Sequence, residues 1–397
     1  MKRFDVAVIG GGPSGLSAAW SASSHNANVI LFEEHEEIGV PRHCAGLVSG
    51  EGLKLIGMPC KSSFIENKVH RALLLINGVC IELKKMGEPL YVLDREAFDK
   101  EMAERALYSG SNMMLNTRVK ELERKGEDIV VKTTRGSYLC RLAIDGEGAK
   151  ASLAVRMGLG GPQYRLPALQ MELRGASVHS DEVLVIEGRR WAPGFFAWII
   201  PLSNNEVRVG LASIIGRCDL LLKRLMKKHP LASKVLKNCA VKRVYGGTVV
   251  LGSIKKAFTE NLMVVGDAAG QTKPLTGGGI IYGSLCGSIA GMIAAKVVER
   301  KAKVEVYEKA WRRILNIEEK MGLLIRKLIT EKEEDLARIA SLGFRTKLIS
   351  LIEREVHYDY HVTSIIRKPG LLMLSALILT LVNPMKAFKY SLQAFLS

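Results

Sequence analysis

The sequence predicts an α/β protein made of a nucleotide-binding domain, a second domain rich in β-strands, and a helical carboxyl-terminal region. Three observations support this fold class. The amino terminus has a strand, a glycine turn, a helix and a second strand in succession. The middle of the chain is rich in strand-like segments, and apolar residues recur at helical spacing after Arg300. With 397 residues, 48% of them hydrophobic, the chain is long enough for two domains and a sizeable core.

The amino-terminal unit begins with the apolar strand FDVAVIG and continues through GGGPSG into the helix-compatible segment LSAAWSASS. Gly10, Gly12 and Gly15 have the G-x-G-x-x-G spacing of a Rossmann-type dinucleotide site, and Ser14 lies in the same turn. The first glycine makes the tight turn, the second admits a pyrophosphate, and the third lets the helix pack on the strand. A second apolar run, ANVILFEEH, contains Glu33 at the position of a carboxylate that holds a ribose hydroxyl. This unit alone does not distinguish FAD from NAD.

The composition limits the function classes. The net charge of +17 suits a solvated basic surface, anionic lipid headgroups or an acidic electron-donor protein. The basic residues form no run interleaved with aromatic residues, so we expect no nucleic-acid partner. Seven cysteines without any C-x-x-C pair argue against a zinc site and against a disulfide framework, and they fit a reducing compartment. From this cysteine pattern we also expect that the protein binds no metal. The start of the chain, MKRFDVAVIGGG, resembles no export signal, so we expect a cytoplasmic protein.

One apolar segment near the carboxyl terminus has two possible roles. LLMLSALILTLV, from Leu371 to Val382, is shorter than the roughly 18 residues that a membrane-spanning helix needs. It is flanked by basic residues, namely Arg367, Lys368, Lys386 and Lys389. This pattern is compatible with a buried core helix and with an anchor at a membrane surface.

The segment NLMVVGDAAGQTKPLTGGGIIYGSLCGSIAGMIAA, from Asn261 to Ala295, indicates which dinucleotide is bound. It combines a strand, an aspartate, a proline, a glycine triplet and a helix of small residues. This arrangement resembles the FAD-dependent p-hydroxybenzoate-hydroxylase-like superfamily. The resemblance implies that Asp267 accepts a hydrogen bond from the ribityl chain of FAD, and that Gly279 and Ile280 lie beside the isoalloxazine ring.

Smaller matches to the same superfamily lie elsewhere in the chain. In YVLDREAFD, Asp94 is expected to cap a helix, and the resemblance implies that Arg95 lies against the cofactor. Asp145 belongs to a D-G segment like that of the superfamily, and Val119 falls on the strand residue that touches adenine.

Residues 161–244 are expected to form a β-rich substrate domain that contains PGFFAWIIP, from Pro193 to Pro201. This stretch resembles the P-x-x-Y-x-W-x-F-P motif of the geranylgeranyl reductase family, with Phe196 in place of the tyrosine and Ile200 in place of the last phenylalanine. Phe196, Trp198 and Ile200 alternate along a strand and therefore share one face, which is either a wall for an isoprenoid chain or an ordinary sheet face. The resemblance implies substrate contacts for all five motif residues: Pro193, Phe196, Trp198, Ile200 and Pro201. The same stretch also partly resembles the W-x-W-x-I-P motif of flavin-dependent halogenases.

The segment EIGVPRHCAG places a cysteine shortly after the second strand. In the geranylgeranyl reductase family a cysteine at this spacing lies next to the flavin ring, so the resemblance implies that Cys44 contacts the cofactor and takes part in catalysis. Ala45 and Gly46 are small, which would let the loop approach the ring closely. His43 is a candidate to supply or orient a proton.

The resemblance implies an FAD-dependent reductase that saturates C=C bonds of geranylgeranyl chains, by hydride transfer from reduced flavin together with protonation. The substrate would be an archaeal-type membrane glycerophospholipid, with the enzyme held at the inner face of the membrane. Two alternatives remain open: a flavin-dependent monooxygenase or halogenase, and an isoprenoid-binding flavoprotein without turnover. The chain has no second G-x-G-x-x-G unit, so the electron donor is left open among ferredoxin, a reduced deazaflavin and a nicotinamide.

These segments predict a domain order in which both domains are discontinuous. The FAD-binding domain is expected to combine residues 1–60, 92–160 and 245–300, and the substrate domain residues 61–91 and 161–244. Residues 301–397 are expected to form a helical region packed on the core. Its basic residues, including Arg312 and Arg326, are expected to lie on a solvated face.

Overall fold

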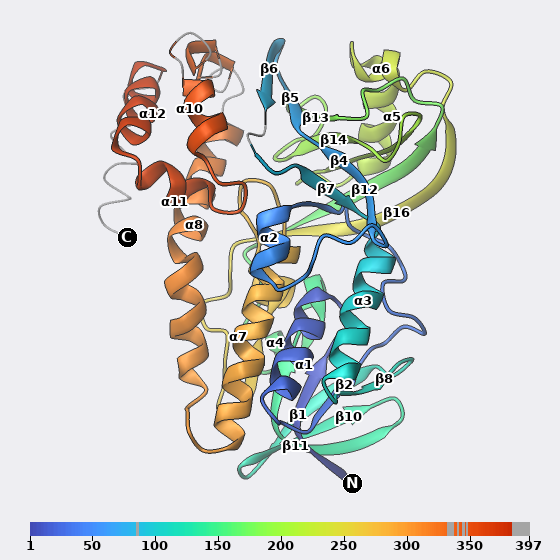
Figure 1. Ribbon diagram of the computed structural model, residues 1–397, viewed down its shortest axis with the longest axis vertical. Helices are drawn as coiled ribbons and strands as arrows, with labels where there is room; N and C mark the ends of the chain where they lie inside the picture. The colour runs from blue at the N-terminus through green and yellow to red at the C-terminus, as the bar shows by residue number, and fades with distance from the viewer. Residues whose placement is uncertain (85–86, 332–336, 340, 344–345, 347, 383–397) are drawn as a thin grey trace.

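The computed structural model describes the chain with the exception of residues 85–86, 332–336, 340, 344–345, 347 and 383–397. Figure 1 shows two lobes, which we call the lower and the upper lobe. The lower lobe contains the amino terminus and the first sheet, and the upper lobe contains the second sheet. The long helix α8 (Glu305–Glu331) runs along one side, from the lower lobe to the upper lobe.

The first sheet is the predicted nucleotide-binding sheet. Its strands are β1 (Lys2–Ile9), β2 (Val29–Phe32), β8 (Asn112–Met114), β9 (Val119–Lys125), β10 (Asp128–Thr133), β11 (Gly136–Asp145) and β17 (Leu262–Val264). They are ordered β8-β2-β1-β11-β10-β9, and β17 pairs with the end of β11. Because β1 is parallel to both β2 and β11, the carboxyl ends of these strands meet at one edge of the sheet, where a dinucleotide binds in this architecture.

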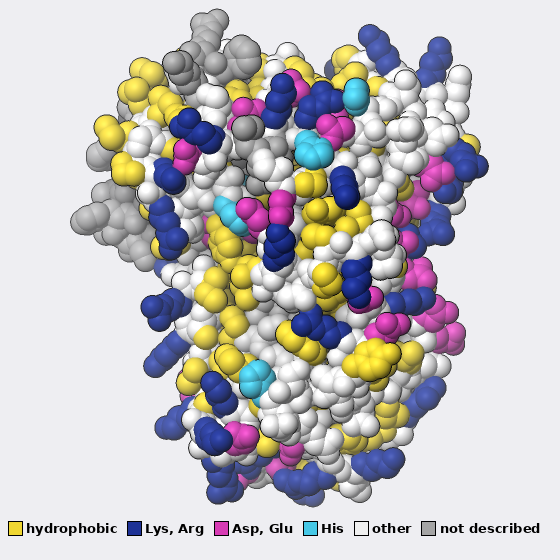
Figure 2. All heavy atoms as spheres, viewed as in Figure 1, with side chains coloured by type: hydrophobic (Ala, Val, Ile, Leu, Met, Phe, Trp, Pro, Cys, Tyr) yellow, Lys and Arg dark blue, Asp and Glu magenta, His cyan; other side chains and the backbone are white. Residues whose placement is uncertain are grey.

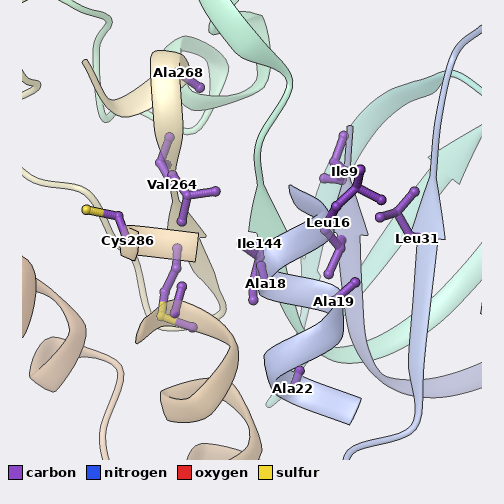
Figure 3. Close-up of a cluster of buried hydrophobic side chains, with 14 of the residues drawn as sticks. Ile9, Leu16, Ala18, Ala19, Ala22, Leu31, Ile144, Val264, Ala268 and Cys286 are labelled. Carbon is purple, nitrogen blue, oxygen red and sulfur yellow. The ribbon is translucent and has the colours of Figure 1, made fainter. Parts of the chain in front are cut away.

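Helices of small residues pack tightly on this sheet. The helices of the lower lobe are α1 (Pro13–Ser24), α2 (Gly50–Leu55), α3 (Arg95–Tyr108), α4 (Ser152–Arg156) and α7 (Ile280–Val298). A Cβ atom on Gly291 of α7 would lie 2.3 Å from the carbonyl oxygen of Ala18 in α1, so the two helices approach as closely as their backbones allow. Figure 3 shows Ala18 and Ala22 of α1 between the strand that carries Ile9 and the helix that carries Cys286.

The second sheet confirms the predicted β-rich domain. Its strands are β5 (Arg71–Ile76), β6 (Val79–Lys84), β12 (Tyr164–Arg174), β13 (Glu182–Glu187), β14 (Phe196–Pro201), β15 (Glu206–Ala212) and β16 (Ala240–Leu251), in the order β16-β12-β15-β14-β13-β5-β6. Helices α5 (Cys218–Lys228) and α6 (Ala232–Val235) cover one face, against Ala197 and Ile199. The opposite face carries Trp198 and Ile200, which pack with Val92 and Leu251.

The expected boundary between residues 244 and 245 is wrong. Strand β16 pairs with β12 along its whole length, up to Leu251 opposite Tyr164, so the second sheet extends past that boundary.

A third, small sheet joins the two lobes. It consists of β3 (Leu47–Ser49), β4 (Ile65–Val69) and β7 (Leu90–Leu93), with β7 in the middle.

The described part of the carboxyl-terminal region is helical, as predicted, and contains α8, α10 (Leu348–Glu355), α11 (His361–Ile366) and α12 (Pro369–Val382). Leu371 of α12 packs with Leu348 of α10, whereas other apolar side chains of α12 are exposed: Leu372, Met373, Leu377 and Leu381. Lys386 and Lys389 lie outside the described residues. Within the described part of the chain, α7 is the one helix long and apolar enough to cross a membrane, but 67% of its apolar window is buried in the protein. It is therefore a core helix of the lower lobe.

Candidate cofactor and substrate site

The turn between β1 and α1 leaves room for a pyrophosphate. Gly10 has a φ of +96°, and a Cβ atom there would lie 2.3 Å from the carbonyl oxygen of Gly146. A Cβ atom on Gly15 would lie 2.0 Å from the carbonyl oxygen of Gly10. A Cβ atom on Gly12, by contrast, would meet no heavy atom within 4 Å. Gly12 is the N-cap residue of α1, which begins at Pro13, and no side chain caps the helix. The helix amino terminus therefore opens onto empty space, as an anion site requires.

Glu33 lies beside this turn with a buried carboxylate. Its Oε2 accepts a hydrogen bond from the backbone N–H of Gly11 at 2.6 Å, and its Oε1 accepts one from that of His35 at 2.9 Å. A pocket of about 380 Å³ lies next to Glu33 and is lined by Glu34, Asn116, Arg118, Thr134 and Arg135. The side chain of Val119 is buried in the sheet, so a contact with adenine would involve its backbone. The ribose role of Glu33 and the adenine role of Val119 stay predictions.

Asp267 and the amino terminus of α7 lie together. A Cβ atom on Gly279 would lie 2.8 Å from Oδ1 of Asp267, and α7 begins at the next residue, Ile280. Burial raises the pKa of Asp267, and the charges of His43 and Arg95 oppose that rise. Within the described residues its carboxylate accepts no hydrogen bond, although the side chain keeps accessible surface. An enclosed carboxylate with free acceptors beside a helix amino terminus fits a ribityl chain and a flavin ring.

Ser14 connects the two helix starts. A Cβ atom on Gly266 would lie 2.2 Å from Oγ of Ser14, and one on Gly283 would lie 2.3 Å from it. The hydroxyl group therefore occupies the gap between α1, α7 and the segment that carries Asp267.

Cys44 lies in a loop that contacts a buried arginine. Its sulfur accepts a hydrogen bond from the backbone N–H of Gly46 at 3.4 Å. Arg95 is 8% exposed and is paired with Asp99 at 2.9 Å, so it is not a solvated surface residue. Burial lowers the pKa of Arg95, but the charges of Asp99 and Cys44 outweigh this effect and leave the guanidinium protonated. The Cys44 thiol is therefore a neighbour of a fixed positive charge.

His43 is exposed, and its Nδ1 lies 3.0 Å from the carbonyl oxygen of Pro41. Burial raises the pKa values of Asp267 and Asp99, and the charge of His43 opposes that rise at both carboxyl groups. The catalytic roles of Cys44 and His43 stay predictions.

Phe196, Trp198 and Ile200 share one face of the second sheet, as the alternation predicts. The rings of Phe195 and Phe196 stack with centroids 4.2 Å apart, and Trp198 is edge-on to Phe196 at 6.1 Å. A Cβ atom on Gly277 would lie 3.0 Å from the Phe195 ring. Phe195, which the motif does not include, is thus the aromatic residue that reaches the segment before α7. Trp198 and Ile200 are almost fully buried, so Phe196 is the most accessible of the three predicted wall residues.

The two motif prolines anchor the ends of the segment. The carbonyl oxygen of Pro193 accepts a hydrogen bond from the backbone N–H of Ile214 at 3.0 Å, and that of Pro201 accepts one from the Asn67 side chain at 2.9 Å. Their substrate contacts stay predictions. The indole Nε1–H of Trp198 is buried and has no hydrogen-bond partner among the described residues.

Arg326 of α8 was expected on a solvated face, and this expectation is wrong. It is 7% exposed, its guanidinium lies 4.0 Å from the Phe195 ring centroid, and it donates a hydrogen bond to the carbonyl oxygen of Leu275 at 2.8 Å. Burial lowers its pKa to about 10. Sequence reasoning missed this contact because the helical spacing of α8 does not show which arginine meets the second sheet.

Residues 357–361, which we call the carboxyl-terminal strap, were also missed. Asp359 is fully buried, forms an ion pair with Lys273 at 3.0 Å, and accepts a hydrogen bond from the Ser49 hydroxyl group. The Tyr282 hydroxyl group donates to the carbonyl oxygen of Asp359 at 2.5 Å. The strap is therefore fastened to the segment before α7, to the start of α2 and to α7 itself. The only sequence signal was the cluster HYDYH between two helical segments.

A buried ionic cluster holds the Cys44 loop from the other side. Arg208 is 1% exposed, donates to the carbonyl oxygen of Ala45 at 2.8 Å, and pairs with Glu66 and Glu172 at 2.9 Å each. Burial raises the pKa of Glu66, whereas for Glu172 the effect of burial is overcome by Arg208 and Tyr245, which leave its pKa below the ordinary value. This cluster fixes Ala45, one of the predicted cofactor contacts, through its backbone.

No group of three potential metal-binding His, Cys, Asp or Glu side chains occurs among the described residues, and all seven cysteines are free.

Comparison with known proteins gives the family. The model of the FAD dependent oxidoreductase family matches residues 5–166. Among solved structures, a geranylgeranyl bacteriochlorophyll reductase-like protein from Thermoplasma acidophilum has a TM-score of 0.83 and 22% identity, with 98% of this chain and 99% of that chain covered. The flavin-dependent halogenase CmlS has a TM-score of 0.67 and 17% identity, with 86% of this chain and 73% of that chain covered. These two structures share the fold.

Sequence relatives are closer. A digeranylgeranylglycerophospholipid reductase of Methanopyrus kandleri is 30% identical over 395 residues, which cover 93% of this chain and 98% of the relative. A digeranylgeranylglycerophospholipid reductase of Methanosarcina acetivorans is 31% identical over 367 residues, which cover 85% of this chain and 88% of the relative. The chain therefore belongs to the digeranylgeranylglycerophospholipid reductase family, and it is an FAD-dependent reductase.

Proposed function

We propose that this enzyme saturates C=C bonds of geranylgeranyl chains on archaeal-type glycerophospholipids. The observation that carries the proposal is the full-length similarity to reductases of that name. The aromatic face of the second sheet supports it: buried Phe195 lies against Gly277, and Phe196, which stacks on Phe195 and is only partly buried, offers an apolar surface to a long hydrocarbon chain.

The residues of the site suit this chemistry. When bound and reduced, FAD supplies the hydride that an alkene must accept. The chain supplies the rest: the open helix start at Gly12 binds the pyrophosphate, Asp267 orients the ribityl chain, and the aromatic face excludes water from the reacting carbons. Cys44 and Arg95 present a polarisable thiol and a fixed positive charge where the loop approaches the ring.

An anaerobic assay tests the function. The purified protein is loaded with FAD, reduced with dithionite and given a geranylgeranylated glycerophospholipid, and the lipid mass and the flavin spectrum are followed together. We expect stepwise gain of hydrogen pairs by the lipid with reoxidation of the flavin. Dithionite replaces the physiological donor, so the result does not depend on whether that donor is ferredoxin, a deazaflavin or a nicotinamide. An unchanged lipid with flavin that stays reduced until air is admitted would refute the proposal and favour an oxygen-dependent enzyme.

Replacing Cys44 tests the role of the thiol. Cys44→Ala is expected to keep FAD affinity within about threefold and to slow lipid reduction by about 100-fold or more, because the contributions of a positioned acid or polar group to catalysis are of that size. Anaerobic single-turnover reoxidation measures the rate, and flavin fluorescence measures the affinity. Cys60→Ala is the matched control, because Cys60 is an exposed thiol. Full activity in Cys44→Ala would remove the catalytic role.

We further propose that α12 holds the enzyme on an anionic membrane, where a lipid substrate resides. Its exposed residues Leu372, Met373 and Leu377 lie near the exposed basic residues Arg367 and Lys368. Figure 2 shows hydrophobic side chains gathered at the upper edge that α12 occupies, next to basic ones. Apolar side chains beside positive charges suit an interface with anionic lipid headgroups.

Charge substitutions on α12 test this surface. The double variant Met373→Glu, Leu377→Glu is expected to reduce binding to phosphatidylcholine vesicles that contain phosphatidylglycerol by about tenfold or more, since each apolar side chain withdrawn from water contributes ~1–3 kcal/mol. Vesicle co-sedimentation measures the binding. Tyr108→Glu is the control, because Tyr108 is 90% exposed at the end of α3 in the lower lobe. Equal binding of the double variant and the wild type would contradict the proposal.

A further inference from the structure

The hydroxyl group of Tyr358, in the carboxyl-terminal strap, does not take part in the hydrogen bonding of the fold. Within the described residues this hydroxyl group makes no hydrogen bond, yet it is not among the buried polar atoms that lack a partner, so it retains access to open space. The Tyr358 ring lies 4.1 Å from Nζ of Lys273 and is edge-on to His361 at 5.9 Å. The ring is thus held while its hydroxyl group is left free.

The surroundings place this free hydroxyl group at the cofactor site. The Tyr358 ring rests on Lys273, whose side chain lies against the glycine triplet: a Cβ atom on Gly278 would lie 2.7 Å from Cε of Lys273. Burial raises the pKa of Tyr358, and the charges of Asp359 and Cys44 raise it further, so the phenol is protonated. His361 is enclosed in the same way, with burial and Lys273 lowering its pKa to about 3, so it is neutral. Both side chains keep some accessible surface.

The strap positions Tyr358 rigidly. The next residue, Asp359, is fastened to Lys273 and Ser49, and Lys273 itself belongs to the segment that precedes α7. The backbone N–H of Lys273 donates to the carbonyl oxygen of Gly278 at 3.0 Å, so the strap and the glycine triplet are tied to each other. Tyr360, two residues along, faces the other way: its ring lies 6.0 Å from that of Tyr282 and packs on the core of the lower lobe.

We propose that the phenol of Tyr358 is the proton donor of the reduction, facing the substrate alkene from the strap beside Cys44. This inference rests on the proposed function. The O–H bond of Tyr358 breaks and a C–H bond forms at one alkene carbon, while the hydride from reduced FAD forms the C–H bond at the other carbon and the cofactor is left oxidised. The phenolate then regains a proton from water. Lys273 and Asp359 are positioning residues, which hold the ring through the strap.

The first test measures geometry without turnover. In the apoprotein of Tyr358→Cys, dibromobimane, which fluoresces after it joins two neighbouring thiols, is expected to link the introduced thiol to Cys44. Bound FAD is expected to slow this reaction by about tenfold or more. Because Cys286 of α7 is near Tyr360, the matched control is Tyr360→Cys in a Cys286→Ala background, which should stay dark, as should Tyr358→Cys in a Cys44→Ala background. A dark Tyr358→Cys protein, or labelling that FAD does not slow, would overturn the placement.

The second test measures chemistry. Tyr358→Phe keeps the ring over Lys273 and removes only the acid, so its melting temperature and its FAD affinity are expected to match the wild type. Anaerobic flavin reoxidation by the geranylgeranyl lipid is expected to slow by about 100-fold or more. In D2O, deuterium should enter the wild-type product in one configuration and the residual Tyr358→Phe product in both. Tyr360→Phe should behave as the wild type in each measurement.

The outcomes separate this inference from the proposed function. If the wild type and Tyr360→Phe reduce the lipid and Tyr358→Phe does so equally fast, Tyr358 is not the donor and the function stands. If the wild type fails to reduce the lipid, the proposed function fails, and with it the role of Tyr358.

Discussion

Gly12→Ala is expected to abolish tight FAD binding while the apoprotein stays folded. A Cβ atom at this position would meet no protein atom within 4 Å, and the φ of Gly12 is −83°, which alanine adopts freely. The open space is the place where the pyrophosphate approaches the backbone at the start of α1, so a methyl group there would compete with the cofactor. We expect the Kd for FAD to rise by at least about 100-fold, equivalent to ~2.7 kcal/mol.

Fluorescence titration of the apoprotein with FAD, together with thermal unfolding of the apoprotein, checks this result. Gly370→Ala is the matched control: a Cβ atom there also meets nothing within 4 Å, but Gly370 lies in α12, away from the glycine turn. Gly15→Ala is expected to behave differently from both, because its Cβ atom would collide with the backbone of Gly10 and destabilise the apoprotein as well. Unchanged FAD affinity in Gly12→Ala would place the pyrophosphate elsewhere.

Arg208→Met is expected to have the largest effect on stability, a loss of about 3–5 kcal/mol in the free energy of unfolding at pH 8. Removing the guanidinium leaves the buried Glu172 and the partly buried Glu66 without their main partner, and it also frees the carbonyl oxygen of Ala45 in the Cys44 loop. In contrast, Arg124→Met breaks an ion pair between exposed side chains, with Glu260, and should change stability little.

The destabilisation caused by Arg208→Met is expected to depend on pH. In the wild type the pKa of Glu172 is below its ordinary value, so its contribution to stability is complete above the unfolded pKa and is lost as the pH falls through the folded pKa. In Arg208→Met we expect burial to raise the pKa values of both carboxyl groups, so that acid neutralises them and relieves the destabilisation. Denaturant unfolding at pH 8 and about pH 5 should therefore show a smaller difference between variant and wild type at the lower pH. A difference that stays constant or grows would show that the cluster is not held by charge.

Much of the cofactor half of the molecule could be predicted from the sequence because its motifs are local. The glycine turn, the start of α3 after Asp94 and the start of α7 at Ile280 each depend on residues within a few positions of one another. Asp94 caps α3 through the backbone N–H groups of Glu96 and Ala97, as its position before the helix predicts. The alternation of Phe196, Trp198 and Ile200 likewise fixes which side chains share a face, since a strand has a period of two.

The sequence could not show which residues of the folded protein would contact those faces and turns. The wall residues Trp198 and Ile200 are covered, and Phe195, outside the alternating set, is the ring that reaches Gly277. The domain boundary was misplaced because strand β16 continues for as long as β12 offers a partner, and the pairing of two strands far apart in sequence has no local signal.

The sequence by itself determined the nucleotide-binding unit and the family resemblance, because the motifs that carry them are short and depend on local sterics and hydrogen bonding. Only the tertiary structure decided how the site is enclosed. Asp359 meets the hydroxyl group of Ser49 across 310 positions of sequence, and Arg208 meets the backbone of Ala45 across 163. Such contacts exist because a buried charge needs a partner and finds the nearest one in space, whatever its place along the chain.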